Sequence, residues 1–239
     1  PRSSSAASDV YKRQILMSAT LISYSCPVVK DETKKQGSVQ DLIAFCARVS
    51  NPENQHNTAT NEKLIRYLIK HDHWSPLEMA SVCMEITTTR DIARQIIRHR
   101  SFSFQEFSQR YAVAENFEDR EARLQDKKNR QNSVETDNAD LQEQWKSKQE
   151  ELIDHSKSVY SWALENGIAK EQARAVLPEG NTQSTLYMNG TLRSWVHYIQ
   201  LRSGNGTQKE HQKVAIACAE AIREIFPMIM EFVTQEESG

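Results

Sequence analysis

A stretch of fourteen residues carries the side chains best suited to chemistry in this sequence. It runs from Arg98 to Tyr111 (RHRSFSFQEFSQRY) and holds three arginines, a histidine, a glutamate and three serines, interleaved with three phenylalanines. An arginine side chain binds phosphates and carboxylates through two parallel hydrogen bonds. Serine hydroxyls can donate to the same oxygens, while the phenylalanines can anchor the segment in a core. The stretch therefore favours a nucleotide phosphate site over a solvated face, where lysine would be commoner.

Two other interpretations of the stretch stay open on its residues alone. An Arg-His-Arg run at the end of a helix is also favoured by the helix dipole, with no function attached. Basic residues interleaved with aromatics could instead stack single-stranded nucleic acid. The formal net charge of -2 and the lack of a second such patch make nucleic-acid binding the weaker alternative. Ser108 is a candidate nucleophile by position, but its local sequence offers no base, so it is interpreted as a binding residue.

The whole-chain composition limits the other classes of function. The chain has 239 residues, a size that suits one domain. No apolar run approaches the roughly 20 residues that span a bilayer, and no membrane partner is expected. His71 and His73 lack a third ligand at a recognisable spacing, so no metal site is expected. The cysteines are widely spaced, which argues against disulfides and zinc and favours a reducing, cytoplasmic location. They are Cys26, Cys46, Cys83 and Cys218, each expected to be a small buried residue.

The sequence divides into a leader, one domain and an insertion. Residues 1–16 are rich in Ser and Ala without an apolar core, and we expect a non-native or disordered leader. Residues 17–239 are expected to form a single domain. The run at about 115–150 is nearly all charged residues, Gln and Asn, so it is interpreted as a solvated insertion. It leads into a helix that is expected to end at Gly167.

Hydrophobic periodicity places the fourteen-residue stretch at the end of a helix. From Asp91 to about Arg100, apolar residues recur on one arc of a helix and polar residues on another. We therefore expect Arg98 to Arg100 to end this helix and Glu106 to Arg110 to follow in a loop.

The remaining elements indicate an α+β fold, with a small sheet flanked by long helices and a helix-rich C-terminal half. Ser38 with Asp41, and Thr207 with Glu210, have the spacing of capping boxes, the second opening a last long helix. Strands are predicted at 19–29, 80–88 and 185–188, helices at about 38–49, 61–70, 173–177 and 191–203, a loop at 71–78, and packing roles for Trp74, Trp145, Trp162 and Trp195.

The stretch from Arg98 to Tyr111 resembles the defining motif of flavin-dependent thymidylate synthases: Arg-His-Arg, seven residues, a serine, and then Arg and Tyr. The similarity covers roughly residues 40 to 225 in the expected order. It includes Ala47–Ser50 (ARVS), His73–Glu78 (HWSPLE), Ala93–Gln95 (ARQ), Ala173–Pro178 (ARAVLP) and Leu192–Arg202 (LRSWVHYIQLR).

The resemblance implies the reductive methylation of dUMP to dTMP, without a protein nucleophile. Methylenetetrahydrofolate would be the one-carbon donor, and FAD reduced by NADPH would be the cofactor. The family forms homotetramers with sites at subunit contacts, so self-association is expected. A degenerate homologue that binds flavin and nucleotide without turnover is the alternative, besides a single-stranded nucleic-acid binding protein.

The resemblance also implies roles for particular residues. Arg202 would be the catalytic residue, a fixed cation that stabilises the N3 anion of the uracil ring. Gln105 and Thr191 each stand where the family often has asparagine, which affects two expected contacts near the flavin. Residues implied to hold FAD are Ser50, His73, Ser75, Glu78, Arg98, His99, Arg100, Glu106, Thr191, Arg193 and His197. Residues implied to hold dUMP are Gln95, Arg98, Glu106, Phe107, Ser108, Gln109, Arg110, Arg174 and Arg202.

Overall fold

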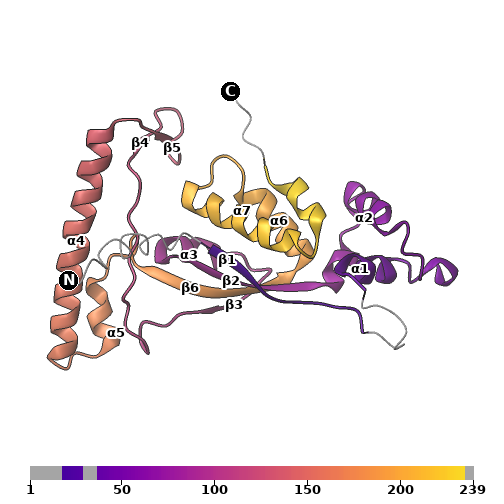
Figure 1. The fold of residues 1–239 in the computed structure, drawn as a ribbon, viewed down its shortest axis with the longest axis horizontal. Coiled ribbons are helices and arrows are strands. Elements are labelled where there is room, and N and C mark those ends of the chain that lie inside the picture. The colour runs from indigo at the N-terminus through magenta and orange to yellow at the C-terminus, as the bar shows by residue number, and fades with distance from the viewer. Residues whose placement is uncertain (1–17, 29–36, 235–239) are drawn as a thin grey trace, which may run out of the picture.

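The computed structural model describes residues 18–28 and 37–234, so the expected leader at 1–16 lies outside the described residues. The predicted α+β fold is confirmed, with a small antiparallel sheet and helices packed around it. Figure 1 shows helices α6 and α7 over one face of the sheet, helix α4 at one end of the molecule, and helices α1 and α2 at the other end.

The central sheet has the strand order β1-β2-β6-β3 and is antiparallel throughout. Side chains alternate across β2, where Val82, Met84 and Ile86 are buried between half-buried neighbours. Met84 lies opposite Met188 of β6, and both are fully buried. One face of the sheet therefore carries the core. The strands are β1 (Ser18–Tyr24), β2 (Ser81–Thr89), β3 (Ser103–Glu106) and β6 (Gln183–Thr191).

Two C-terminal helices cover the buried face of this sheet. These are α6 (Leu192–Arg202) and α7 (Lys209–Arg223). Trp195 of α6 is fully buried, and its indole N–H donates to the carbonyl of Val82 at 3.0 Å, as a buried indole requires. This contact fixes α6 on the sheet, and with it the side chains at the C-terminal end of the helix.

The two N-terminal helices were predicted with close bounds. Helix α1 (Val39–Ala47) is capped by Ser38, and the capping box with Asp41 is present. Helix α2 (Asn61–Lys70) has the predicted limits. The predicted loop at 71–78 contains a short 3-10 helix, η3 (Ser75–Met79), with Pro76 in its first turn.

The helix before the arginine-rich stretch, Arg98 to Tyr111, is shorter than predicted. Helix α3 spans Arg90–Ile96 and closes on Ile97, so the prediction that Arg98 to Arg100 end it was wrong. Those residues lie in the following turn. Glu106 was predicted in a loop, but it is the last residue of β3, which pairs with β6. The edge strand escaped prediction because it is defined only by its pairing with β6, whose residues lie 80 to 86 positions later in the sequence.

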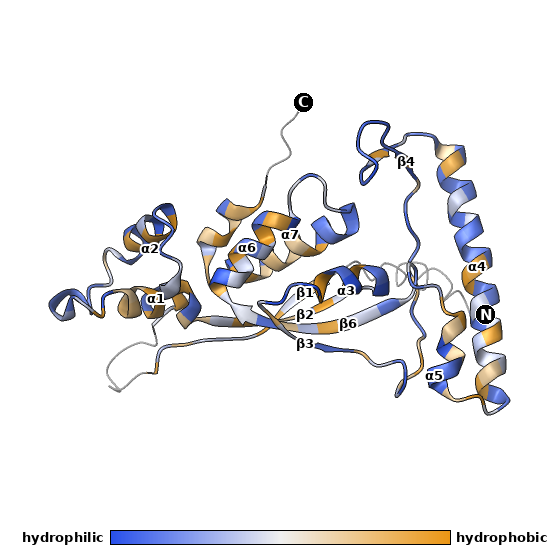
Figure 2. Ribbon diagram, turned by 180° about the vertical axis from the view of Figure 1, so that it is seen from behind, coloured by the Kyte–Doolittle hydropathy of each residue, from blue (hydrophilic) through white to orange (hydrophobic). Residues whose placement is uncertain are grey.

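The charged segment at 115–150 is only partly solvated. It forms a hairpin of β4 (Arg123–Gln125) and β5 (Ser133–Glu135) before the 27-residue helix α4 (Ala139–Glu165). Figure 2 shows the hairpin and the neighbouring end of α4 as mainly hydrophilic. Helix α4 ends just before Gly167, whose φ of 76° matches the predicted stop. After it come α5 (Lys170–Ala173) and η4 (Arg174–Val176), and the chain's last helical segment described is η5 (Pro227–Phe232).

Three local predictions were wrong. The capping box of Thr207 with Glu210 does not form, because α7 begins at Lys209 and the Glu210 carboxylate is bound by Arg123 instead. Trp145 and Trp162 are 44% and 58% exposed, so they are not core residues. Among the cysteines, Cys218 is buried as expected, while the other three are only half-buried.

Candidate active site

A cavity of about 300 Å³ lies between helix α3 and the segment that follows α5. Three of its lining side chains are arginines, against one carboxylate. It is lined by Arg90, Arg94, Gln109, Arg174, Ala175, Leu177 and Glu179. A small polar cavity with an excess of guanidinium groups is suited to an anion, and above all to a phosphate group.

Gln109 supplies an unsatisfied donor at this cavity. The residue is only 3% exposed, and its Nε2 has no hydrogen-bond partner among the described residues. A buried amide without a partner costs free energy, and such groups are rare in folded proteins. A ligand that carries oxygen acceptors would satisfy it. The residues present therefore fit a nucleotide, and Gln109 is where the resemblance placed one.

Glu106 organises the arginines of the cavity from the end of β3. Its carboxylate lies 3.6 Å from Arg90 and 3.9 Å from Arg94, and it accepts a hydrogen bond from the Ser184 hydroxyl at 2.9 Å. Glu179 approaches the same two arginines at 3.3 and 3.7 Å. Arg90 and Arg94 were not predicted as site residues. Arg90 directly follows three threonines of β2, and nothing in its local sequence distinguishes it.

The loop after β3 brings Arg110 close to Arg174. Arg110 forms an ion pair with the Glu171 carboxylate at 3.3 Å, and Arg174 donates to the Glu171 carbonyl at 3.3 Å. The Ser108 hydroxyl accepts from the backbone N–H of Arg110, and the N–H of Phe107 donates to β6 at 2.9 Å. Of the predicted dUMP residues of this loop, Gln109 lines the cavity and Arg110 contacts Glu171, three residues before the cavity residue Arg174.

The predicted catalytic residue contacts the arginine-rich stretch directly. Arg202, at the C-terminal end of α6, donates from Nε to Nε2 of His99 at 2.9 Å. Burial, with the added charges of Arg202 and Arg98, lowers the pKa of His99 to about 4. His99 is therefore neutral near pH 7, and its Nε2 is free to accept.

A buried polar chain lies behind this contact. The Tyr198 ring packs edge-on against His99 at 5.0 Å, and the Tyr198 hydroxyl lies 3.1 Å from Nε2 of His211. Nδ1 of His211 lies 3.3 Å from Oε1 of Gln95, a predicted dUMP residue. Tyr198 and His211 were not predicted. Tyr198 could have been, since it lies four residues before Arg202 on the same helix face.

The predicted flavin residues of α6 lie against the 71–78 segment. Arg193 forms an ion pair with Glu78, and the His197 ring lies 4.6 Å from the Trp74 ring. Burial, followed by the charge of Arg193, lowers the pKa of His197. His73 and Ser75 belong to the same segment, where the N–H of His73 donates to the Leu68 carbonyl.

Thr191 has a structural role in this region. Its hydroxyl accepts from the backbone N–H of Ser194 and caps α6. The Ser194 hydroxyl in turn donates to the Ser101 carbonyl at 3.3 Å, which joins the start of α6 to the arginine-rich stretch. A side chain that already caps a helix has less freedom to contact a ligand.

The structure does not bring every predicted residue into the site. Ser50 is exposed after α1, and within the described ranges it has no hydrogen bond or ion pair to another predicted site residue. Arg98 and Arg100 are also exposed, and neither forms an ion pair with any residue between 37 and 234. Among the described residues there is no group of three metal-ligating side chains and no helix long and apolar enough to cross a membrane.

Comparison with known proteins identifies the family. The family model described as thymidylate synthase complementing protein matches residues 33–228. The chain is 52% identical over 214 residues to a probable flavin-dependent thymidylate synthase of Paramecium bursaria Chlorella virus 1, covering 89% of this chain and 97% of the relative. The chain belongs to the family of flavin-dependent thymidylate synthases.

Other members of the flavin-dependent thymidylate synthases and a solved structure agree with this assignment. A flavin-dependent thymidylate synthase of a Synechocystis strain is 47% identical over 192 residues, covering 80% of this chain and 88% of that protein. A UMP/dUMP methylase, PolB from Streptomyces cacaoi, bound with 5-Br dUMP, has a TM-score of 0.76 at 25% identity, covering 90% and 94% of the two chains. The arginine-rich cavity and the Arg202–His99 pair thus belong to an enzyme of this family.

Proposed function

We propose that the protein catalyses the reductive methylation of dUMP to dTMP, with methylenetetrahydrofolate as one-carbon donor and FAD, reduced by NADPH, as cofactor. The observations that carry the proposal are the arginine-lined cavity with the unpartnered Gln109 amide and, separately, the Arg202–His99 pair. The names of the viral and Synechocystis relatives support it, as does the dUMP analogue bound to the Streptomyces methylase.

The cavity binds the phosphate end of dUMP in this proposal. Arg174 and Gln109 line the cavity and supply donors. Arg110 and Arg174 both contact Glu171, the first at its carboxylate and the second at its backbone carbonyl. Charge-assisted hydrogen bonds from arginine are stronger than neutral ones, and arginine retains its charge at every working pH. Glu106 limits the freedom of Arg90 and Arg94 and so preorganises the charge of the cavity.

Arg202 activates the pyrimidine in this proposal. Its guanidinium is oriented by the neutral His99, which accepts one of its N–H groups. A fixed cation against the uracil ring stabilises negative charge that develops at N3 and so polarises the ring toward the incoming carbon. Ser108 acts as a binding residue, since its hydroxyl contacts only a backbone N–H of its own loop among the described residues.

The flavin is proposed to lie over the exposed end of the same region. When bound, FAD supplies the hydride transfer and carries the one-carbon unit. Arg98 and Arg100 are exposed cations without an ion pair in the described part of the chain, so they are available to a pyrophosphate. Arg193 and His197 present donors from one face of α6, and Glu78 restrains Arg193. Ser50, His73, Ser75, His99, Glu106 and Thr191 complete the proposed flavin set.

A homotetramer with sites at subunit contacts is part of the proposal. Two observations support it. The flavin cations lie on the surface of the single chain, and Ser50 has no hydrogen bond or ion pair to the other proposed flavin residues within the described ranges. A second copy would complete such an open site. A cytoplasmic location is proposed because the cysteines of the described chain are free thiols.

The proposal is tested by incubating the purified protein anaerobically with NADPH, dUMP and methylenetetrahydrofolate, and by following dTMP by chromatography. The protein should be yellow as purified, and dTMP should form only when all three compounds are present. Bound FAD without any dTMP would overturn the synthase proposal and support the degenerate homologue. The nucleic-acid alternative predicts a colourless protein and is not favoured by the family assignment.

A further inference from the structure

Gln95 lies within a continuous chain of hydrogen bonds. Its Nε2 donates to Oε1 of Gln208 at 2.8 Å, and Nε2 of Gln208 donates to Oε2 of Glu210 at 2.9 Å. On the other side, Oε1 of Gln95 faces Nδ1 of His211 at 3.3 Å, and Nε2 of His211 faces the Tyr198 hydroxyl at 3.1 Å. The chain thus connects a proposed dUMP residue with two side chains of α7 and one of α6.

The direction of every hydrogen bond in this chain follows from its Glu210 end. An ionised carboxylate only accepts, so Gln208 must turn its NH₂ group toward Glu210 and its oxygen toward Gln95. Gln95 must then donate to Gln208 and present its own oxygen to His211. That oxygen only accepts, so His211 carries its proton on Nδ1, and its Nε2 accepts from the Tyr198 hydroxyl.

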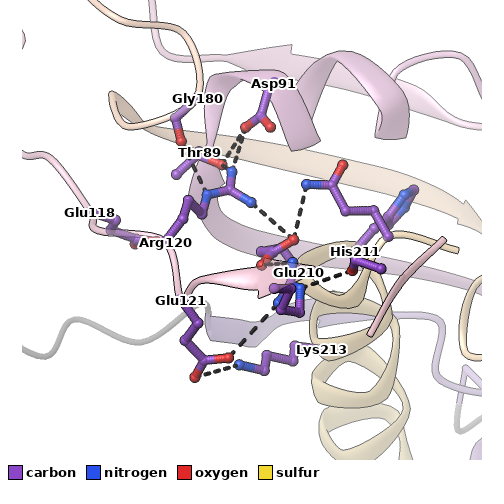
Figure 3. Close-up of polar contacts among 12 residues, drawn as sticks. Thr89, Asp91, Glu118, Arg120, Glu121, Gly180, Glu210, His211 and Lys213 are labelled. Atoms are coloured by element: carbon purple, nitrogen blue, oxygen red, sulfur yellow. Dashed lines mark hydrogen bonds and ion pairs between the residues drawn. The ribbon is translucent and has the colours of Figure 1, made fainter. Parts of the chain in front are cut away.

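The charged insertion holds the carboxylate that sets this direction. Glu210 is 4% exposed, and it binds Nη2 of Arg123 at 2.5 Å and Nη1 of Arg120 at 3.0 Å. Arg120 also donates to Asp91 of α3 at 2.7 Å (Figure 3). Burial would raise the pKa of Glu210, but the hydrogen bond from Arg123 and the charge of Arg120 outweigh it and lower the pKa. The carboxylate is therefore ionised at neutral pH.

We propose that Glu210, held by Arg120 and Arg123 of the insertion, sets the orientation of the Gln95 amide through Gln208. Gln208, Glu210 and His211 are then positioning residues for nucleotide binding, which rests on the proposed function of Gln95. Gln95 keeps one N–H and one oxygen lone pair outside the chain. If the Gln95 amide turned around, it would present an acceptor to the nucleotide where it now presents a donor.

A pair of substitutions at Gln208 tests whether this residue sets the orientation of the Gln95 amide. Gln208→Glu keeps an acceptor toward Gln95, with its protonated carboxyl donating to Glu210 in place of the lost amide N–H. Gln208→Lys offers only donors and requires the Gln95 amide to turn around. We expect the dUMP dissociation constant to stay within about twofold of wild type for Gln208→Glu and to rise roughly tenfold for Gln208→Lys. Charge alone predicts the opposite order, because the added lysine would attract the nucleotide phosphate.

A second readout reports the orientation without any nucleotide. In protein labelled with ¹⁵N-histidine, the long-range ¹H–¹⁵N spectrum distinguishes the two tautomers of His211, and a His211→Gln variant assigns the signals. We expect the Nδ1–H tautomer in wild type and in Gln208→Glu, and the Nε2–H tautomer in Gln208→Lys. Gln200→Lys, at an exposed position of α6, controls for the added charge.

The Nε2–H tautomer in wild type, or an unchanged His211 signal together with wild-type dUMP affinity in Gln208→Lys, would overturn the inference. If wild type itself binds no dUMP, the proposed function fails, while the tautomers still decide whether Glu210 orients Gln95. Thermal unfolding of each variant near the wild-type temperature shows that the comparison is made on folded protein.

Discussion

Arg202 and His99 lie 103 positions apart in the sequence, yet Nε of one donates to Nε2 of the other at 2.9 Å. The contact joins the end of α6 to the arginine-rich stretch. Because Nε2 of His99 accepts, the imidazole is neutral and its proton lies on Nδ1. Protonation of His99 would place two cations in contact, so this pair depends on the low pKa of the histidine.

Replacing Arg202 with Ala should lower the turnover number for dTMP formation by roughly a hundredfold or more, because a preorganised charge is lost from the transition state. Flavin content should be unchanged. Arg223→Ala, an exposed arginine at the end of α7, is the matched control and should retain full activity. Wild-type turnover in Arg202→Ala would exclude the proposed role at N3.

The stability of the protein should depend on pH through His99. The folded-state pKa of about 4 lies below the ordinary value of 6.5, so between these limits the unfolded chain binds a proton that the folded chain does not. The free energy of unfolding should therefore fall as the pH is lowered from about 6.5 to 4. Urea denaturation at several pH values should show a shallower fall for His99→Gln than for wild type. Equal slopes would show that His99 is not held neutral.

Local sequence signals predicted those elements that depend on local contacts. The capping box of Ser38 and the limits of Asn61–Lys70 are set by neighbouring residues, and both were predicted. The box of Thr207 with Glu210 has the same spacing but does not form. Its carboxylate is taken by two arginines about 90 residues away, and no local pattern reports such a partner.

The residues of the site likewise divide into those that a motif identified and those that only the fold brings together. The motifs of the family identified Gln109 and Arg174, which line the cavity, and Arg202, which donates to His99. Arg90 and His211 carry no motif that was recognised, and they join the region only because β2 and α7 pack on the same core. The extent of α3 was overestimated because the apolar arc continues to Ile97, while the chain turns away after Ile96.

Arg174→Ala should weaken the binding of dUMP and leave deoxyuridine, which lacks the phosphate, nearly unaffected. Loss of a charge-assisted hydrogen bond should raise the dUMP dissociation constant by roughly tenfold to a hundredfold. Calorimetric titration of both ligands makes the comparison. Arg130→Ala, an exposed arginine of the β4–β5 hairpin, should change neither value. An equal loss for both ligands would place Arg174 away from the phosphate.

Arg120→Ala should lower the free energy of unfolding by about 3 kcal/mol, because it removes one of the two arginines that bind the buried Glu210 and leaves Asp91 without its ion pair. Chemical denaturation measures the change. Lys148→Ala removes an exposed ion pair with Glu151 and should cost under about 1 kcal/mol. If the two variants lost the same small amount, the insertion would not be anchored through Arg120.

Transfer of the one-carbon unit to dUMP is tested most directly by a single turnover under anaerobic conditions. The flavin-loaded protein is reduced with NADPH and mixed with dUMP and methylenetetrahydrofolate carrying ¹³C at the methylene carbon. The account predicts dTMP with ¹³C in its methyl group, formed in an amount that matches the reduced flavin. A protein that binds and reduces flavin but yields no labelled dTMP would contradict it.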